Sequence, residues 1–190
     1  MRITVVTPTR GTRLTLDGVI ERVGKLLLPG DEHLLIYDAP EKAPQLKFRS
    51  SLFTKLFRYQ HPSSVFGNAQ RDFALTVAKG DCLVYMDDDD WPGPAAFAAL
   101  HAAVADPNVA HFFRMKAKHG VYPSDRPIVG EMGGPQCVPP VRPDLPKWMD
   151  ANVYEADGHF LGKVHSLYTP VHHNEIICYV RGSEWGAACV

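Results

Sequence analysis

Four consecutive aspartates, Asp87–Asp90, follow directly after the apolar segment Leu83–Met86. The apolar segment is typical of a buried strand, and Pro92-Gly93 breaks the chain before an alanine-rich helix. Two carboxylates about 4 Å apart repel each other by about 1 kcal/mol in water and by about 4 kcal/mol near a protein surface. Such charges at the end of a buried strand indicate a bound cation, and carboxylate oxygens suit Mg²⁺ or Mn²⁺. The alternative is a solvated acidic turn that caps the next helix.

Strand-like and helix-like segments alternate along the chain. The sequence predicts strands over Ile3–Thr7 and His33–Tyr37, with a helix over 13–28 between them. This order predicts a parallel unit with a right-handed crossover. Further elements are expected at 67–78 (helix), 94–105 (helix), 109–115 (strand), 153–164 (helix) and 175–180 (strand), with loops and short strands over 118–147. We therefore expect an α/β fold with a mostly parallel central sheet flanked by helices, and ligands at the carboxyl ends of its strands.

The composition is that of an ordinary globular protein: 190 residues, 45% apolar, with a net charge of −1. We expect one compact domain over residues 1–190. No apolar run approaches the roughly 18 residues of a membrane span, and Met1–Val6 is too short and too soon polar for a signal peptide. The four scattered cysteines form no CxxC pair, which indicates free thiols in a reducing compartment. The expected location is cytoplasmic, and the oligomeric state stays open.

Residues 40–66 are irregular and basic, with aromatic and leucine side chains interleaved. The cationic residues of this stretch are Lys42, Lys47, Arg49, Lys55 and Arg58. We favour an amphipathic helix that packs on the sheet and exposes a solvated basic face. The alternative is a surface that binds a polyanion such as DNA, a phosphate-bearing substrate or an anionic lipid head.

Several common motifs are missing. There is no GxGxxG after the first strand and no GxxxxGK[ST], so a dinucleotide fold or a P-loop NTPase has no support. A calcium loop that began at Asp87 would need a bidentate Glu at the position of Ala98. No GxSxG marks a serine nucleophile.

Four blocks of the chain resemble family 2-like GT-A glycosyltransferases in order and spacing. The first strand and its turn, Ile3–Arg10, are similar to the family's VSVVIPTYN, and Asp38 ends the second strand. Gly67–Asp72 corresponds to a G…ARN helix start, and Tyr85–Asp90 to an FLDxDD box. The resemblance covers residues 1–105 well and the remainder weakly. It implies a GT-A (Rossmann-like) fold, with 1–105 as the nucleotide-sugar-binding half and 106–190 as the acceptor and catalytic half.

The resemblance implies a nucleotide-diphosphate-sugar donor, a UDP-sugar by default, and a Mn²⁺ or Mg²⁺ cofactor. By the family pattern, Asp87 and Asp89 hold the cation, and a late histidine, His172 or His173, completes its shell; our choice is His173. The residues that would contact the donor are Thr7, Pro8, Thr9, Arg10, Asp38, Arg71, Asp87 and Asp88. Without the resemblance, Thr7-Pro8 and Asp38 are ordinary turn residues, and Arg71 is a structural ion-pair partner of the aspartates.

Inverting members of the family use one carboxylate to deprotonate the acceptor hydroxyl. The segment that resembles their ED motif is Tyr154–Phe160, in which Ala156 interrupts the doublet. We expect Asp157 to be the base, with Glu155 second; the alternative is an acidic first turn that interacts with the helix dipole. Trp148 and Trp91 are candidates for stacking on a sugar ring.

The sequence thus predicts a metal-dependent, inverting glycosyltransferase that moves a sugar from a nucleotide-diphosphate-sugar to a hydroxyl acceptor. The acceptor is unknown, and the basic stretch makes a polyanion such as DNA one hypothesis. Two alternatives stay open. One is a catalytically weak relative that only binds a nucleotide-sugar, and the other is a metal-dependent nucleotidyl or phosphoryl enzyme that uses the same aspartates.

Overall fold

A computed structural model describes residues 1–37, 52–59, 67–122, 125, 129, 132–148 and 155–180. Asp38 and most of the basic stretch, including Lys42, Lys47 and Arg49, lie outside these ranges. Within the described residues, no helix is both long enough and apolar enough to cross a bilayer.

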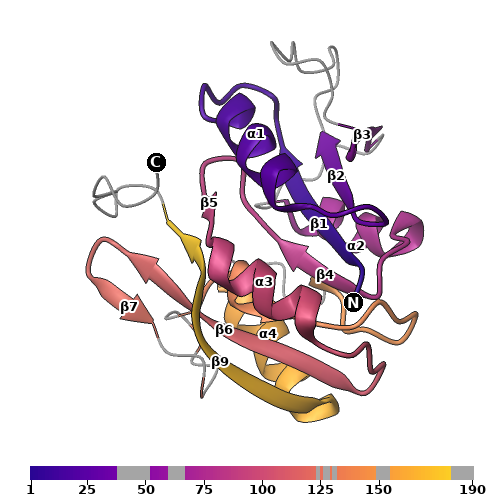
Figure 1. Cartoon of the computed structure of the whole chain (residues 1–190), viewed down its shortest axis with the longest axis vertical. Coiled ribbons are helices and arrows are strands. Elements are labelled where there is room, and N and C mark those ends of the chain that lie inside the picture. Colours follow the sequence, from indigo (N-terminus) through magenta and orange to yellow (C-terminus); the bar gives the residue numbers. More distant parts are fainter. Residues whose placement is uncertain are drawn as a thin grey trace.

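The first half of the chain builds a four-stranded parallel sheet, sheet A (Figure 1). Its strands lie in the order β3-β2-β1-β4. Their bounds are Ile3–Thr9 (β1), Glu32–Tyr37 (β2), Thr54–Arg58 (β3) and Cys82–Tyr85 (β4). Every residue of β1, β2 and β4 is buried, as expected of parallel strands covered on both faces. The predicted α/β fold with a mostly parallel sheet is confirmed.

The second half builds a mixed sheet, sheet B, in the order β5-β9-β6-β7, with β8 also paired to β6. The bounds are Trp91–Pro92 (β5), Val109–Ala117 (β6), Gly120–Tyr122 (β7), Cys137–Val138 (β8) and Thr169–Tyr179 (β9). Strands β6 and β9 are parallel, and the other pairs are antiparallel. Backbone hydrogen bonds join the two sheets: Leu83 N donates to Pro139 O, and Val141 N donates to Asp81 O, each at 2.9 Å.

Helices cover both faces of the sheets. They are Leu16–Leu26 (α1), Asn68–Val77 (α2), Pro94–Ala102 (α3) and Ala156–Leu167 (α4), with a short 3₁₀ helix at Gly134–Gln136. Side chains of α1 and α3 share one hydrophobic core, and side chains of α2 and α4 share another. Figure 1 shows α3 and α4 on opposite sides of β6. Neighbouring residues of β6 therefore serve different cores: Phe112 packs with α4, and Phe113 packs with α3.

Two segments differ from the sequence-based prediction. The favoured amphipathic helix in the basic stretch is wrong for its described part, because Thr54–Arg58 forms β3 beside β2. The free edge of β2 offers backbone hydrogen bonds, and Lys55 Nζ donates to the buried Glu32 at 2.6 Å, so pairing is favoured over a lone helix. The last strand, β9, begins at Thr169 rather than at 175, because it pairs with β6 over that strand's whole length.

Candidate active site

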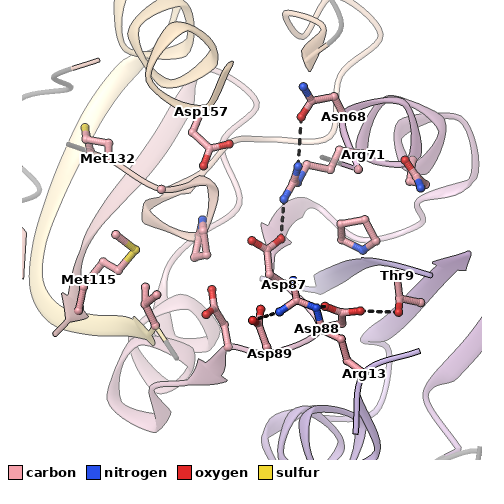
Figure 2. Close-up of a pocket in the computed structure, with 18 of the residues that line it drawn as sticks. Thr9, Arg13, Asn68, Arg71, Asp87, Asp88, Asp89, Met115, Met132 and Asp157 are labelled. Atoms are coloured by element: carbon pink, nitrogen blue, oxygen red, sulfur yellow. Dashed lines mark hydrogen bonds and ion pairs between the residues drawn. The ribbon is translucent and has the colours of Figure 1, made fainter. Parts of the chain in front are cut away.

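A pocket of about 650 Å³ lies where β1 and β4 of sheet A end and where sheet B begins. Both halves of the chain line it, as expected for a ligand site at the carboxyl ends of parallel strands. The lining side chains used below are Pro8, Thr9, Arg10, Arg13, Asn68, Arg71, Asp87, Asp88, Asp89, Asp90, Met115, Tyr122, Met132, Glu155 and Asp157. Figure 2 shows that Met115 and Met132 lie on the wall opposite Thr9 and Arg13.

Arg71 is the buried cation of the site. Its side chain is 4% exposed, and its Nη2 donates to Asp87 Oδ1 at 2.5 Å. Nη1 donates to Asn68 Oδ1 at 3.2 Å, and the guanidinium carbon lies 4.7 Å from the Trp148 ring centre. These three neighbours hold the guanidinium in one place, so Asp87 is anchored from the α2 side as β4 ends (Figure 2).

Arg13 pairs with both Asp88 and Asp89 on another side of the pocket. Thr9 Oγ1 donates to Asp88 Oδ2 at 2.6 Å, and Arg13 Nε donates to Asp88 Oδ1 at 3.0 Å. A second Arg13 nitrogen forms an ion pair with Asp89 (Figure 2). Thr15 Oγ1 donates to the Asp88 carbonyl at 2.8 Å. Burial raises the pKa of Asp88, while Thr9 and Arg13 act against that rise.

Asp157 enters the pocket from the first turn of α4. Gly134 N donates to its Oδ2 at 3.1 Å, and Figure 2 shows the carboxylate facing the side of Arg71 and Asp87. Burial raises the pKa of Asp157; Arg71 lowers it and the negative charge of Asp87 raises it again. Glu155, just before α4, also lines the pocket but is exposed. Of the two predicted base candidates, Asp157 has the environment that moves a carboxyl pKa toward neutral pH.

The pocket holds more negative than positive charge. Among the described residues that line it, six carry a carboxylate and three a guanidinium; the carboxylates belong to Asp87, Asp88, Asp89, Asp90, Glu155 and Asp157, and the arginines are Arg10, Arg13 and Arg71. Such an excess attracts a cation. Among the described residues, no three His, Cys, Asp or Glu side chains converge into a complete metal site. A carboxylate pair that leaves positions open fits Mg²⁺ or Mn²⁺, because these ions commonly share substrate phosphates. The sequence analysis expects Asp87 and Asp89 to hold such an ion, and both line the pocket.

The structure does not bring every predicted site residue to the pocket. Thr7 is fully buried, and its hydroxyl lies 3.0 Å from His33 Nε2, beneath the pocket rather than on its wall. His173 lies on β9, where its ring stacks on Phe113 at 4.2 Å and its Nε2 is 2.9 Å from His111 Nδ1. Neither residue lines the pocket, so the metal site proposed below does not include His173.

The two tryptophans that were candidates for sugar stacking have other roles. Trp148 is 1% exposed, and its ring stacks on Phe160 at 4.2 Å between centroids, within the core that α4 covers. The Trp91 ring lies 3.4 Å from the guanidinium carbon of Arg22. The expectation for Trp148 is therefore corrected, because a side chain buried in the core cannot stack on a ligand.

The sequence analysis missed three pocket residues with clear chemistry. Of the three, only Arg13 is marked by the sequence, because it follows Arg10 at the spacing of one helical turn, shortly after the first predicted strand. Met115 and Met132 come from β6 and from the loop before the 3₁₀ helix, and they form an apolar wall opposite the aspartates. No local pattern marks them, since only the packing of sheet B brings them to the pocket.

The sequence matches no protein-family profile and no curated protein. Solved structures do share the fold. S. aureus TarS 1–349 superposes with a TM-score of 0.71 at 17% identity, covering 95% of this chain and 60% of that one. The same fragment in complex with UDP-GlcNAc gives 0.71 at 16% identity, covering 95% of this chain and 58% of that one.

Mannosyltransferase PcManGT from Pyrobaculum calidifontis, in complex with GDP-Man and Mn²⁺, gives a TM-score of 0.62 at 17% identity, covering 96% of this chain and 58% of that one. The present chain therefore spans less than two thirds of the length of these structures. The likeness shows the architecture alone: the chain shares the α/β fold of these solved structures, with sheet A as its parallel core.

Proposed function

We propose that this chain is a metal-dependent, inverting glycosyltransferase that moves a sugar from a nucleoside-diphosphate sugar to a hydroxyl acceptor. The observation that carries the proposal is the convergence in one pocket of Asp87 and Asp89 from the end of β4, the buried Arg71, and Asp157 from α4. The structural neighbours that bind UDP-GlcNAc and GDP-Man support a donor of this class.

The donor occupies the side of the pocket that sheet A provides. Pro8, Thr9 and Arg10 border the nucleoside, and Asp38, at the end of β2 in the sequence, is proposed to accept a hydrogen bond from the base. Asp87 and Asp89 would hold Mn²⁺ or Mg²⁺, and such an ion would supply positive charge to the departing diphosphate. Arg71 fixes the orientation of Asp87 from the α2 side.

Asp157 is the proposed general base. Its carboxylate takes the proton of the acceptor hydroxyl, and the freed oxygen attacks the anomeric carbon of the donor sugar. The bond from that carbon to the phosphate oxygen breaks, and the electron pair leaves with the nucleoside diphosphate. Because attack and departure occur on opposite faces, the anomeric configuration inverts. The raised pKa of Asp157 suits this role, since a base works best when its pKa lies near the working pH.

The acceptor faces the side of the pocket that sheet B provides. Met115, Tyr122 and Met132 supply apolar surface there, and the carboxylates of Glu155 and Asp157 border it. This combination supports an uncharged hydroxyl acceptor, such as a sugar ring with one apolar face, rather than a polyanion such as DNA. The described part of the basic stretch forms the edge strand of sheet A that lies farthest from β4, and its Lys55 is already paired with Glu32.

The test is a product analysis with UDP- and GDP-sugars, with Mn²⁺ or Mg²⁺ and a panel of neutral sugar acceptors. Glycosyl transfer releases a nucleoside diphosphate and an acceptor that has gained a sugar of inverted configuration. Release of pyrophosphate or inorganic phosphate instead would identify a nucleotidyl or phosphoryl enzyme. Donor binding by calorimetry without any turnover across the panel would identify a binding protein that has lost catalysis.

A further inference from the structure

Arg13 lies where a cation is needed. Its fork reaches two neighbouring carboxylates, Asp88 and Asp89, with Nε 3.0 Å from Asp88 Oδ1 and Nη1 paired to Asp89. Figure 2 shows the guanidinium between the two side chains. One of these carboxylates, Asp89, is also a proposed ligand of the divalent ion. An ion that coordinates the Asp89 oxygen paired with Arg13 would have to replace the guanidinium there, and an ion at the other oxygen would be repelled by it.

The two carboxylates are held differently. Asp88 has a second partner in Thr9, at 2.6 Å, and its backbone carbonyl accepts from Thr15 Oγ1. It is also the more buried of the two, with 10% of its side chain exposed against 18% for Asp89. Thr9 and Thr15 therefore hold Asp88 in place even when the pair between Arg13 and Asp89 is broken. Asp88 can then keep Nε of Arg13 bound while the rest of the guanidinium turns away. The pair to Asp89, which is the more exposed carboxylate and a proposed ligand of the ion, is the one that an entering ion would break.

Arg71 and Arg13, the two arginines described above as ion-pair partners of the aspartates, also differ in how firmly their side chains are held. Arg71 is 4% exposed and held by Asn68, Asp87 and Trp148. Arg13 is 46% exposed and belongs to the connection between β1 and α1, which turns at Gly11 with a φ of 71°. Its neighbour Leu14 is 98% exposed, so this connection is open to solvent on its outer side. Of these two, Arg13 is the cation whose side chain is free to turn while the fold stays intact.

We propose that Arg13 and the divalent ion compete for Asp89, and that the displaced Arg13 binds the diphosphate of the donor. Arg13 lines the same pocket as the proposed cation ligands, so a diphosphate bound there lies within its reach. Arg13 thus weakens binding of the bare ion and strengthens binding of the ion together with the nucleotide. The exchange couples the two ligands, and such couplings are reciprocal. This inference rests on the proposed function, because it requires an ion at Asp89.

The test measures Mn²⁺ binding by electron paramagnetic resonance of the free ion, with and without UDP or GDP. Wild type is compared with Arg13→Gln, with Arg13→Lys and with Arg10→Gln. The last is the matched control for the measurement without nucleotide, since Arg10 lines the same pocket and its loss removes the same charge. Without nucleotide, we expect Arg13→Gln to bind Mn²⁺ about tenfold more tightly than wild type, and Arg13→Lys to fall between them. With nucleotide, we expect Arg13→Gln to bind Mn²⁺ more weakly than wild type.

The gain is expected to disappear when Asp89→Asn is added to Arg13→Gln, because the competed oxygens are then gone. Equal Mn²⁺ affinities of wild type and Arg13→Gln would overturn the exchange while leaving the metal site of the proposed function intact. An equal gain in Arg10→Gln would also overturn it, since general charge would then be the cause. If no variant bound Mn²⁺ with or without nucleotide, the metal dependence of the proposed function would fall, and the exchange with it. Thermal unfolding of each variant verifies that it is folded.

Discussion

At the scale of single residues, the pocket contains a carboxyl group, that of Asp157, whose ionisation costs free energy. Asp157 is held against Gly134 N at 3.1 Å in surroundings that raise its pKa, chiefly by burial and in part by Asp87. A group whose pKa is raised on folding binds protons more strongly in the folded state than in the unfolded chain. Its contribution to stability is therefore complete below the ordinary pKa and is lost as the pH rises through the folded-state value.

Asp157→Asn separates catalysis from stability. We expect transfer activity to fall about 10²- to 10⁴-fold, because the acceptor hydroxyl loses its base. We expect the free energy of unfolding at pH 7 to rise, because the neutral amide avoids the cost of ionisation and its oxygen can still accept from Gly134 N. Rate assays and urea titrations at several pH values measure the two effects.

Glu155→Gln is the control for this prediction, since Glu155 lines the same pocket but is exposed. It should change the stability little. A Glu155→Gln variant that lost activity as severely as Asp157→Asn would show that the base has been assigned to the wrong carboxylate.

At the scale of elements, the junction between β1 and α2 determines where Arg71 lies. Gly67 precedes α2 with a φ of 79°, and a Cβ atom there would lie 2.7 Å from the Cβ of Pro8. The carbonyl of Gly67 accepts the first helical hydrogen bond, from Arg71 N at 3.0 Å. The left-handed conformation and the close approach both require glycine, and together they bring the start of α2 against the end of β1.

Gly67→Ala should therefore destabilise the protein by about 1–3 kcal/mol and weaken donor binding, because α2 must move away from Pro8 and take Arg71 with it. Gly18→Ala is the control. Gly18 lies within α1, and a Cβ atom there would meet open space among the described residues, so alanine should stabilise the protein by up to about 1 kcal/mol. Chemical denaturation measures both variants, and a Gly67→Ala protein as stable as wild type would contradict the first expectation.

The same scale shows which elements the sequence can predict. Strands β1, β2 and β4 are buried on both faces, and each contains a run of apolar or β-branched residues that stands out in the sequence. Strand β3 has exposed side chains, and the segment that leads into it and through it places Leu52 and Leu56, and Phe53 and Phe57, four residues apart, which is also the spacing of a helix. Only the open edge of β2 decides between the two, and that edge is a tertiary feature.

The candidate site divides in a similar way. Asp87, Asp89, Arg71 and Asp157 could be predicted because they belong to short motifs whose order along the chain is informative, and the structure brings all four to one pocket. The place of His173 could not be predicted, since β9 is longer than its apolar part and carries this histidine away from the aspartates. The partners of Asp88 and Asp89 could not be predicted either, because Arg13 reaches both carboxylates from the connection between β1 and α1.

At the scale of the whole molecule, buried histidines link the stability of the fold to acid. His33 is fully buried in β2 between Thr7 and Thr54, and burial lowers its pKa to about 4. Burial and the nearby His173 lower the pKa of His111 to about 4 as well. For such groups the unfolded chain binds more protons than the folded protein between the ordinary value of 6.5 and about 4. Stability is thus lost as the pH falls through that window.

His33→Gln should make the loss of stability between pH 6.5 and 4 shallower by roughly one proton. For a fully buried histidine this corresponds to an effect on the order of 3 kcal/mol across the window. The slope of unfolding free energy against pH is the quantity to measure, because the substitution can also change stability equally at every pH. An unchanged slope would show that His33 does not titrate as its burial implies.

The alternation of Phe112 and Phe113 along β6 has a consequence for how chains of this architecture can vary in length. One residue inserted into or deleted from the middle of β6 would exchange the two rings, so that each faced the wrong layer of helices. Such a change would disrupt both hydrophobic layers simultaneously. Length variation among homologues should therefore collect at the tip of the β6–β7 hairpin, around Lys118 and His119, and spare the strand itself.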